Sequence, residues 1–261
     1  MKYLLIVVWL IAQSVSLFAQ DLSLFEKRTY KNKAGEELPY RILFPKDYDK
    51  NKKYPLVLFL HGAGERGNDN EAQLTHGAKL FLADENRQKY PAIVIFPQCP
   101  KESFWSSVSF DRSKNPPIFS FDYSKPMMSP LISVMAVVNQ IASEEAVDKS
   151  RMYVAGLSMG GMGTFELLYH NPNVFAAAMP ICGGGDAKSY DKRIKKISFW
   201  VFHGDQDAVV DPKYSREMVA RLKELKADVT YTEYPGVNHN SWDNAFAEPT
   251  FMSWMFGHKK K

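Results

Sequence analysis

The chain contains 261 residues, of which 24% are charged and 45% hydrophobic; these values are typical of a globular protein and exclude a disordered or fibrous one. Its net charge of +4 is small and dispersed, which does not favour a nucleic-acid partner. Two cysteines are too few for a disulfide scaffold or a thiolate metal site.

The first 20 residues have the pattern of a secretory signal peptide. Lys2 forms a short, positively charged n-region, and residues 3–12 form an apolar h-region. The residues from there to a cleavage site near Ala19 or Gln20 are more polar. The apolar part is about half of what spans a bilayer, so we favour export over an uncleaved membrane anchor. We therefore expect a single domain over residues 21–261 that is secreted or periplasmic and not stably inserted in a membrane.

Strand patterns follow in chain order. Residues 24–30 and 38–44 show mixed alternation around Gly35, which predicts an antiparallel hairpin. Five unbroken apolar runs then predict central parallel strands, because a strand buried on both faces has no polar side. These runs are residues 56–60, 92–96, 152–156, 176–181 and 197–202. Residues 229–234 alternate, which predicts an edge strand.

Helical patterns separate these runs, at residues 131–146, 161–169, 213–225 and 243–256. Strands that alternate with helices predict a mostly parallel sheet of about eight strands, covered by helices on both faces. Residues 99–130 form a long connection rich in Pro and Ser. Connections of that length are usually functional or disordered, so we expect a loop there.

The segment Gly156-Leu157-Ser158-Met159-Gly160 matches the pattern Gly-x-Ser-x-Gly and lies between a strand pattern and a helix pattern. This context predicts a tight turn that lifts the Ser158 hydroxyl above the sheet, at the positive end of a helix. A hydroxyl in that position can attack a carbonyl carbon. The alternative is an inert serine in a small-residue turn, and the partners described next favour the nucleophile.

A serine nucleophile needs a general base, which is usually a histidine. Among six histidines, His239 lies in a loop between the last strand and the last helix, and we predict that it is the base. The other histidines occupy less suitable positions: His61 and His203 end strands and are expected to brace loops, His76 lies in a polar loop, His170 ends a helix and His258 is in the tail.

The acid that orients the base should lie between the serine and the histidine in chain order. Asp205 and Asp207 both follow the fifth apolar run. Asp205 begins the turn, where an aspartate commonly bonds its own backbone, whereas Asp207 can reach across to His239. We therefore predict that Asp207 is the acid. The weaker alternatives are Asp186 and Asp191.

Acyl transfer also needs two N–H donors for the oxyanion. One is predicted to be the backbone N–H of Met159, which follows the nucleophile. The second is expected in the small-residue loop after the first central strand, at Ala63, with Gly64 as the alternative. In the same loop we expect Glu65 and Arg66 to form a bracing ion pair.

Aromatic residues gather in residues 99–130 and beside the predicted base. Trp105 and Trp242 are the candidates for substrate contact, because aromatic faces suit sugar rings or an aromatic acyl group. The alternative is that these rings anchor the long connection to the core.

Four motifs in this order resemble the α/β-hydrolase superfamily: His61-Gly62-Ala63-Gly64, Gly156-Leu157-Ser158-Met159-Gly160, His203-Gly204-Asp205-Gln206-Asp207 and Asn238-His239-Asn240-Ser241-Trp242. Within it, the chain is similar to the phospholipase/carboxylesterase group and to secreted feruloyl- and acetylxylan-esterase-like enzymes, often labelled predicted peptidases. The resemblance implies the α/β-hydrolase fold, a Ser158–Asp207–His239 triad, no metal and no organic cofactor.

The resemblance also implies a sheet order in which the strands ending near Cys99 and Cys182 are separated by two others. Three inter-strand spacings of about 4.8 Å exceed the reach of a disulfide. We therefore predict that both cysteines are free.

The expected activity is cleavage of carboxylic esters, either small molecules or acyl groups linked to polysaccharides, such as feruloyl or acetyl esters. The alternatives are a small serine peptidase of prolyl-oligopeptidase type, or a phospholipase or thioesterase. The short segment before the first central strand leaves no room for the propeller of such peptidases, which weakens that alternative. A non-catalytic binding protein on the same scaffold would lack a triad member, and none is missing.

Overall fold

The computed structural model describes residues 21–114 and 116–260. The predicted signal peptide, residues 1–20, lies outside the described residues. The assignment of residues 21–261 to one domain therefore stays a prediction.

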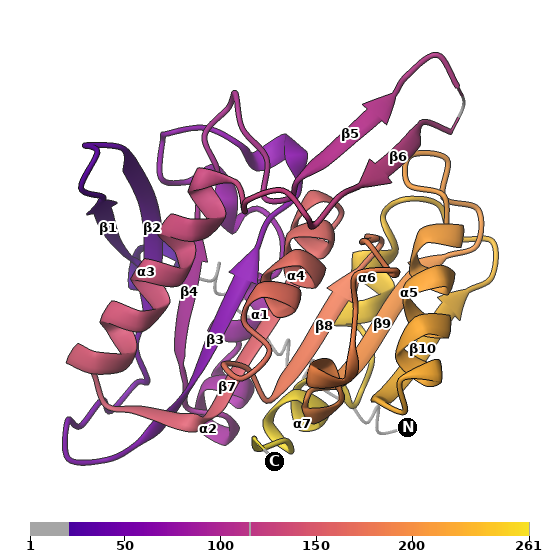
Figure 1. Ribbon diagram of the computed structural model, residues 1–261. Helices are drawn as coiled ribbons and strands as arrows, with labels where there is room; N and C mark the ends of the chain where they lie inside the picture. The colour runs from indigo at the N-terminus through magenta and orange to yellow at the C-terminus, as the bar shows by residue number, and fades with distance from the viewer. Residues whose placement is uncertain (1–20, 115, 261) are drawn as a thin grey trace, which may run out of the picture.

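An eight-stranded sheet runs through the molecule in the order β1-β2-β4-β3-β7-β8-β9-β10 (Figure 1). Its strands are β1 (Glu26–Lys31), β2 (Glu37–Leu43), β3 (Tyr54–Leu60), β4 (Ile93–Pro97), β7 (Val147–Leu157), β8 (Ala177–Ile181), β9 (Ser198–Gly204) and β10 (Asp228–Tyr234). β1 and β2 form the antiparallel hairpin, and β2 also pairs antiparallel with β4. The remaining neighbours, β4, β3, β7, β8, β9 and β10, are parallel to one another. The predicted mostly parallel sheet is confirmed, and so is the position of β10 at its edge.

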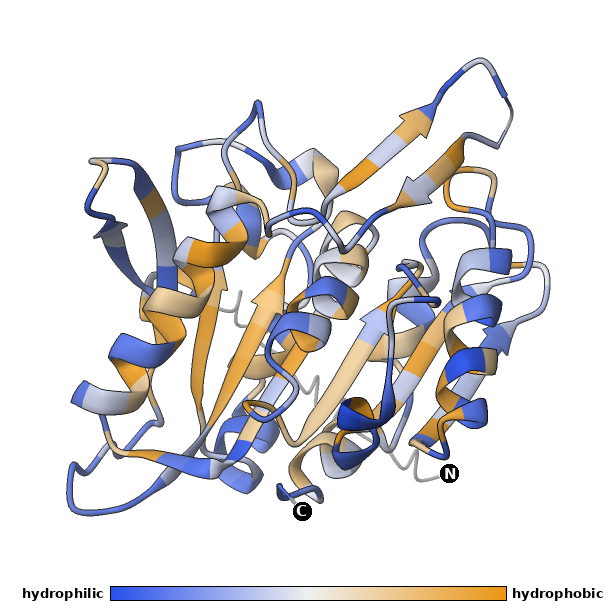
Figure 2. Ribbon diagram, viewed as in Figure 1, coloured by the Kyte–Doolittle hydropathy of each residue, from blue (hydrophilic) through white to orange (hydrophobic). Residues whose placement is uncertain are grey.

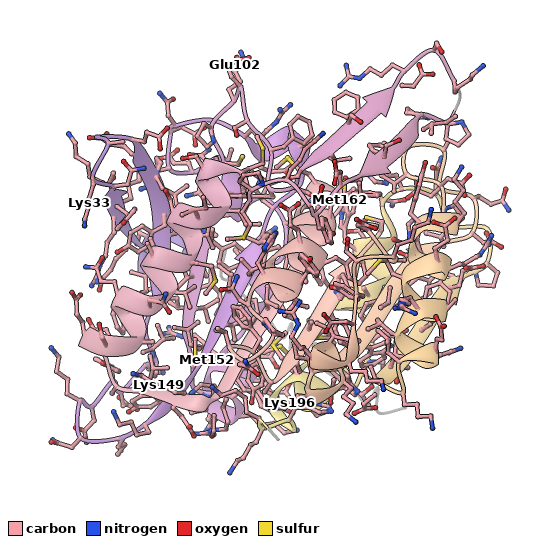
Figure 3. The ribbon with its side chains drawn as sticks, in the orientation of Figure 1. Lys33, Glu102, Lys149, Met152, Met162 and Lys196 are labelled. Carbon is pink, nitrogen blue, oxygen red and sulfur yellow. The ribbon has the colours of Figure 1, made fainter. Side chains whose placement is uncertain are left out.

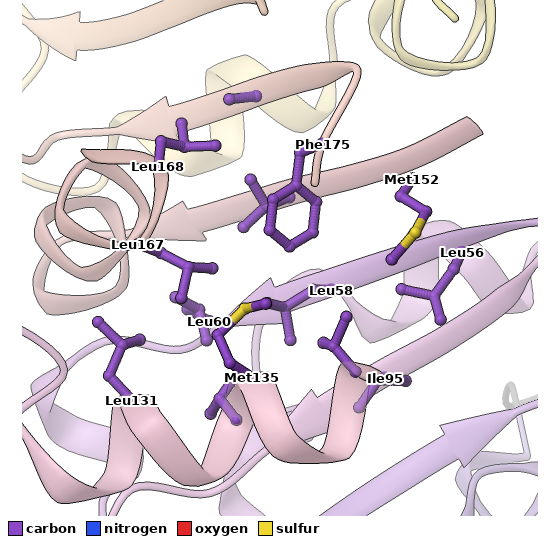
Figure 4. Packing of buried hydrophobic residues seen from close by; sticks show 14 of the residues in the cluster. Leu56, Leu58, Leu60, Ile95, Leu131, Met135, Met152, Leu167, Leu168 and Phe175 are labelled. Carbon is purple, nitrogen blue, oxygen red and sulfur yellow. The ribbon is translucent and has the colours of Figure 1, made fainter. Parts of the chain in front are cut away.

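The unbroken apolar runs form the central strands because both of their faces are covered. In β3, Leu56, Leu58 and Leu60 enter one hydrophobic core, whereas Val57 and Phe59 enter a second core on the opposite face. Figure 4 shows the first core, where the leucines of β3 meet side chains of two helices. A strand placed between two cores has no solvent-facing position, which is why its sequence shows no alternation.

Helices cover both faces of the sheet. On the front in Figure 1 lie α3 (Ser129–Glu144), α4 (Met159–His170) and α5 (Lys213–Glu224). On the other face lie α1 (Ala78–Leu82), α2 (Asp84–Lys89), α6 (Ser241–Phe246) and α7 (Phe251–Phe256). Short 3-10 turns occur at η1 (Leu22–Leu24), η2 (Ala63–Glu65), η3 (Ala72–Leu74) and η4 (Lys192–Lys196). The α/β-hydrolase fold expected from the resemblance is observed.

Two expected elements differ from the structure. The predicted helix at residues 243–256 is divided into α6 and α7, because Pro249 has no N–H to donate and disfavours a helical conformation at Glu248. The long connection at residues 99–130 is not only a loop. It contains an antiparallel hairpin of β5 (Val108–Asp111) and β6 (Ile118–Phe121), which projects beyond the sheet (Figure 1).

The two cysteines are buried and free, as predicted. Strands β3 and β7 separate the strand that precedes Cys99 from the strand that precedes Cys182. Burial raises the pKa of the Cys99 thiol to about 12. Both thiols are therefore expected to be unreactive while the protein is folded.

The outer surface is polar over most of the molecule. The side chains of Lys33, Lys149 and Lys196 point outward, whereas that of Met152 lies inside (Figure 3). In Figure 2, apolar residues line the sheet interior and also appear on the projecting hairpin. Among the described residues, none of the helices combines the length and the apolar character that crossing a membrane requires.

Candidate active site

Ser158 lies in the turn between β7 and α4. Its backbone has φ 54° and ψ −118°, a conformation that residues other than glycine rarely adopt. The turn is held by a hydrogen bond from Ser158 N to Ile181 O of 2.9 Å. Strain of this kind persists only where the surroundings fix the backbone, and it is common at functional sites.

The flanking glycines make this turn possible. A Cβ atom at Gly160 would collide with the backbone oxygen of Leu60, and one at Gly156 would collide with Gly160 O. The helix therefore starts in direct contact with β3. This contact places Ser158 beside the loop that follows β3.

A chain of two hydrogen bonds joins three of the predicted residues. His239 Nε2 lies 3.0 Å from Ser158 Oγ, and His239 Nδ1 lies 2.7 Å from Asp207 Oδ2. Because a carboxylate can only accept, Nδ1 carries the proton and Nε2 is free to accept one from the serine. The three residues come from the ends of β7, β9 and β10, which meet at one edge of the sheet.

Asp207 is held by four donors. Its Oδ1 accepts hydrogen bonds from Val209 N at 2.8 Å and Val210 N at 2.9 Å, and its Oδ2 faces His239 and His203. Burial alone would raise the pKa of Asp207, but the bonds from His203, His239 and the backbone hold it well below its usual range. The carboxylate is therefore ionised and fixed in orientation.

The sequence did not reveal the contact between His203 and Asp207. Its Nε2 lies 2.8 Å from Val210 O and 3.2 Å from Asp207 Oδ2. Since a carbonyl oxygen only accepts, this nitrogen carries a proton and also donates toward the carboxylate. The bracing role expected of His203 is observed, and through Asp207 it extends to the site.

The other candidate acids have structural contacts elsewhere. Asp205 accepts a hydrogen bond from Gly236 N at 2.7 Å and so joins two loops. Asp186 accepts from Tyr123 N and from Ser189, while Asp191 caps η4. These carboxylates are engaged in structural contacts; the bond of Asp205 reaches another loop and not, as the sequence had suggested, its own turn.

The two expected oxyanion donors lie beside Ser158. Met159 and Ala63 are the first residues of α4 and η2, so no carbonyl of their own helix accepts their N–H groups. Both residues line the cavity that contains Ser158, whereas the alternative Gly64 does not.

The loop around Ala63 is braced differently from our expectation. No ion pair joins Glu65 to Arg66 within the residues that the structure describes. Arg66 instead donates from Nε to Ala63 O at 2.9 Å and from Nη1 to Ser103 O at 3.1 Å. Glu65 lies 3.7 Å from His76. The Arg66 guanidinium is therefore held by backbone carbonyl oxygens and not, as we had expected, by the carboxylate of Glu65.

Trp105 is not available for substrate contact, contrary to our expectation. It is 0% exposed, and its Nε1 donates to His61 O at 3.1 Å. His61 in turn accepts from Cys99 N at 2.9 Å, and burial lowers its pKa to about 4. The anchoring role that we considered for Trp105 is the one observed, since the ring supports the loop that carries Ala63.

Trp242 stands beside the predicted base. Its ring lies edge-on to His239, with ring centroids 5.3 Å apart, and 5.1 Å from the ring of His76. It does not line the cavity above Ser158. Its position favours support of the imidazole, and contact with substrate stays a prediction.

A cavity of about 270 Å³ opens above Ser158. Its lining combines apolar and aromatic residues with two arginines: Ala63, Arg66, Phe104, Phe110, Arg112, Pro117, Phe119, Ser158, Met159, Met162, Val209 and Val210. The projecting β5–β6 hairpin forms its outer wall, and Met162 of α4 lies where the helix meets this hairpin (Figure 3).

The base of the hairpin is fixed by a buried carboxylate. Glu166 of α4 is 0% exposed and accepts hydrogen bonds from Ser106 Oγ at 2.7 Å, Ser107 N at 2.6 Å and Ser107 Oγ at 2.9 Å. Burial raises the pKa of Glu166, while these bonds lower it in part. The cavity wall is thus tied directly to α4, the helix that follows Ser158.

One group of described side chains has the composition of a metal site. Ligand atoms of Cys182, Asp207 and His239 lie within 4.8 Å of one another. A metal ion there would compete with the Asp207–His239 hydrogen bond. The group therefore belongs to the hydrogen-bonded chain rather than to a separate metal centre.

Comparison with known proteins identifies the family of the chain. Residues 32–184, more than half of the chain, match the family described as Putative esterase. The chain belongs to this esterase family. It is a carboxylic ester hydrolase with the α/β-hydrolase fold.

Two solved structures are similar to it. A thermostable esterase is 38% identical with a TM-score of 0.82, and the alignment covers 91% of this chain and 64% of that protein. A ferulic acid esterase from Anaeromyces mucronatus is 17% identical, with a TM-score of 0.66 and coverage of 89% and 90%. The second likeness concerns the fold alone.

Among curated relatives, lysophospholipase-like protein 1 of Mus musculus is 26% identical over 195 residues, which are 70% of this chain and 79% of that protein. A probable feruloyl esterase C of Aspergillus niger is 24% identical over 171 residues, 66% of this chain and 55% of that protein. The chain thus spans about half the length of the second relative.

Proposed function

We propose that this esterase is a serine hydrolase that acts through Ser158, His239 and Asp207. The observation that supports this most strongly is the unbroken hydrogen-bonded chain from Asp207 through His239 to Ser158, ending at a strained serine. The order of the three groups matches the nucleophile, base and orienting acid of acyl transfer.

The proposed reaction has two halves. Ser158 Oγ attacks the ester carbonyl while its proton passes to His239 Nε2, and that proton then goes to the departing alcohol oxygen, leaving an acyl-enzyme. Water attacks the acyl carbon, His239 takes its proton and returns it to Ser158, and the carboxylic acid is released. Asp207 keeps the Nδ1–H tautomer and stabilises the imidazolium formed in each half.

The oxyanion of each tetrahedral intermediate would accept hydrogen bonds from Met159 N and Ala63 N. Both donors stand at helix starts, whose partial positive charge favours a developing negative one. Arg66 supports this arrangement because its Nε bonds the carbonyl of Ala63.

The substrates proposed are esters with an aromatic or sugar-linked group, including feruloyl and acetyl esters of polysaccharides. The aromatic rings of the cavity suit a flat acyl or alcohol group. The names of the Anaeromyces and Aspergillus relatives, both ferulic or feruloyl esterases, support the same class.

Export is part of the proposal and rests on residues 1–20. Production of the full chain in a bacterial host should give a protein that starts near residue 20 or 21, as measured by its intact mass. Recovery of the protein with Met1 still attached would contradict export.

Replacement of Ser158 tests the mechanism. Ser158→Ala should lower kcat for 4-nitrophenyl acetate at least about 10⁴-fold, with circular dichroism unchanged, because the attacking oxygen is gone. Ser253→Ala removes the hydroxyl of an exposed residue of α7 and should retain full activity. Activity of Ser158→Ala near that of the control would refute the assignment. A peptide amide assayed in parallel separates esterase from peptidase activity.

A further inference from the structure

Two guanidinium groups line the cavity above Ser158, those of Arg66 and Arg112. Within the described part of the chain, neither has an acidic side chain within 4 Å. Arginines of the outer surface such as Arg216 and Arg221 are, by contrast, paired with Glu233 and Glu224. Positive charge is therefore left without a counter-charge where a substrate would bind.

The two arginines lie over aromatic rings. Arg66 Cζ lies 4.6 Å from the ring centroid of Phe104, and Arg112 Cζ lies 4.7 Å from that of Phe110. The two rings are 5.5 Å apart, so the four side chains form a run of cation, ring, ring and cation. A guanidinium stacked on a ring keeps its N–H edge available for hydrogen bonds.

These N–H edges are largely unused. Arg66 directs Nε and Nη1 to the carbonyls of Ala63 and Ser103, which leaves Nη2 without an acceptor among the described residues. The Arg112 guanidinium donates no hydrogen bond within the same part of the protein, and its contact is the ring of Phe110. Each guanidinium has five N–H groups in a planar fork that fits a carboxylate, sulfate or phosphate.

The arginines are separate from the proposed catalytic groups. The oxyanion donors are the backbone N–H groups of Met159 and Ala63, and the proton passes through His239. The two guanidiniums are therefore free to contact a part of the substrate other than the ester carbonyl. Arg66 is partly buried and Arg112 is exposed. Both stand beside aromatic rings of the cavity, and their two positive charges together favour an anion there.

We propose that this cavity binds an anionic substituent, a carboxylate in the first instance, carried by the aromatic or short acyl or alcohol part of the ester. The inference rests on the proposed function, because it assumes that the ester carbonyl lies at Ser158. The preferred substrates would then be monoanions: esters in which one carboxyl group is free and another position is acylated or esterified.

Matched pairs of esters test this and show which side of the ester carries the charge. The acyl pair is mono-(4-nitrophenyl) terephthalate and its methyl ester. The alcohol pair is 4-acetoxybenzoate and its methyl ester. Each enzymatic kcat/KM is divided by the rate constant for hydroxide hydrolysis, which removes differences in intrinsic reactivity. In one of the two pairs, this normalised kcat/KM should be about tenfold higher for the anionic ester than for its neutral partner at low ionic strength. Salt above about 0.5 M should abolish most of that difference.

Arg112→Gln is the diagnostic variant because Arg112 lies outside the proposed catalytic groups. It should lower kcat/KM for the preferred anionic ester about tenfold and change that for its neutral partner less than about twofold. Arg28→Gln is the matched control. It removes the same charge and a similar ring contact, with Phe44, but lies on β1 away from the cavity.

Equal use of both members in both pairs by the unaltered enzyme would overturn the inference. So would an Arg112→Gln variant that slows the anionic and neutral esters alike, or an Arg28→Gln variant that has the same effect as Arg112→Gln. If none of the four esters were hydrolysed, the proposed function would fail, and this inference would fail with it.

Discussion

The hydrogen-bonded chain that ends at Ser158 and the projecting β5–β6 hairpin both contribute to one site, but they are built in opposite ways. Asp207 is buried and accepts from two backbone amides and two imidazoles. The hairpin strands alternate between partly buried and exposed residues, and Ile118 is 40% exposed. The proposed catalytic groups are fixed in one geometry by backbone hydrogen bonds, whereas the proposed substrate contacts lie on a surface element.

The largest expected effect is a loss of kcat when Asp207, in the hydrogen-bonded chain, is replaced. Asp207→Asn should lower kcat for 4-nitrophenyl acetate by about 10⁴-fold, because an amide nitrogen cannot accept the Nδ1–H of His239 and the imidazole turns to the wrong tautomer. Steady-state kinetics on the folded variant would measure this.

Asp205→Asn is the matched control for that variant. Its amide oxygen can still accept the hydrogen bond from Gly236 N, so kcat should stay close to that of the unaltered enzyme. Equal losses from the two variants would mean that the acid of the site is not Asp207.

The next largest effect concerns stability. Gly160→Ala should lower the free energy of unfolding by about 2–3 kcal/mol, because its Cβ would press on the backbone of Leu60 and His61 and cannot be relieved by a rotamer change. Urea denaturation would measure it. A Cβ at Gly64 meets nothing within 4 Å, so Gly64→Ala should change stability by less than about 1 kcal/mol. Similar values for both variants would contradict the close helix–strand contact.

A smaller effect, a rise in KM, is expected when Phe119 of the β5–β6 hairpin is replaced. Phe119→Ala removes a ring from the cavity wall and should raise KM for an aromatic ester about threefold to tenfold, with little change in kcat. Ile118 lies next to it on β6 and does not line the cavity, so Ile118→Ala should leave KM unchanged. A loss confined to kcat in Phe119→Ala would show that the ring positions the catalytic groups instead.

The smallest expected effect is that of a thiol reagent on the native protein, because both cysteines are buried. Iodoacetamide should leave the native protein unmodified and add two adducts after denaturation without reductant, as measured by intact mass. A denatured protein that takes up no adduct would contradict the separation of Cys99 and Cys182 across the sheet.

The difference between the two regions also explains what the sequence predicted well. Ser158, His239 and Asp207 each follow a strand, and strand ends in a parallel sheet meet at one edge, so chain order and local pattern were enough to expect these three side chains close together, as they are. The apolar runs of the central strands were equally informative, because a strand buried on both faces is apolar at nearly every position.

The parts that were missed depend on contacts between segments far apart in the chain. Strands β5 and β6 have four residues each, too short for alternation to stand out in a connection rich in Pro and Ser. The expected partner of Arg66 was the adjacent acid, yet its guanidinium bonds the carbonyl of Ser103, 37 positions away. The burial of Trp105 likewise depends on the fold of the whole connection.

The anchoring of the hairpin to Glu166 has a consequence for engineering the enzyme. Ser106 and Ser107 fasten one end of this segment to α4, and Tyr123 N bonds Asp186 at the other. With both ends fixed, the tip between Asp111 and Ile118 behaves as a closed loop, and doubling its length costs only about 0.6 kcal/mol in closure entropy. The hairpin can therefore be treated as an exchangeable cassette, in which libraries of sequence and length alter substrate choice on an unchanged catalytic scaffold.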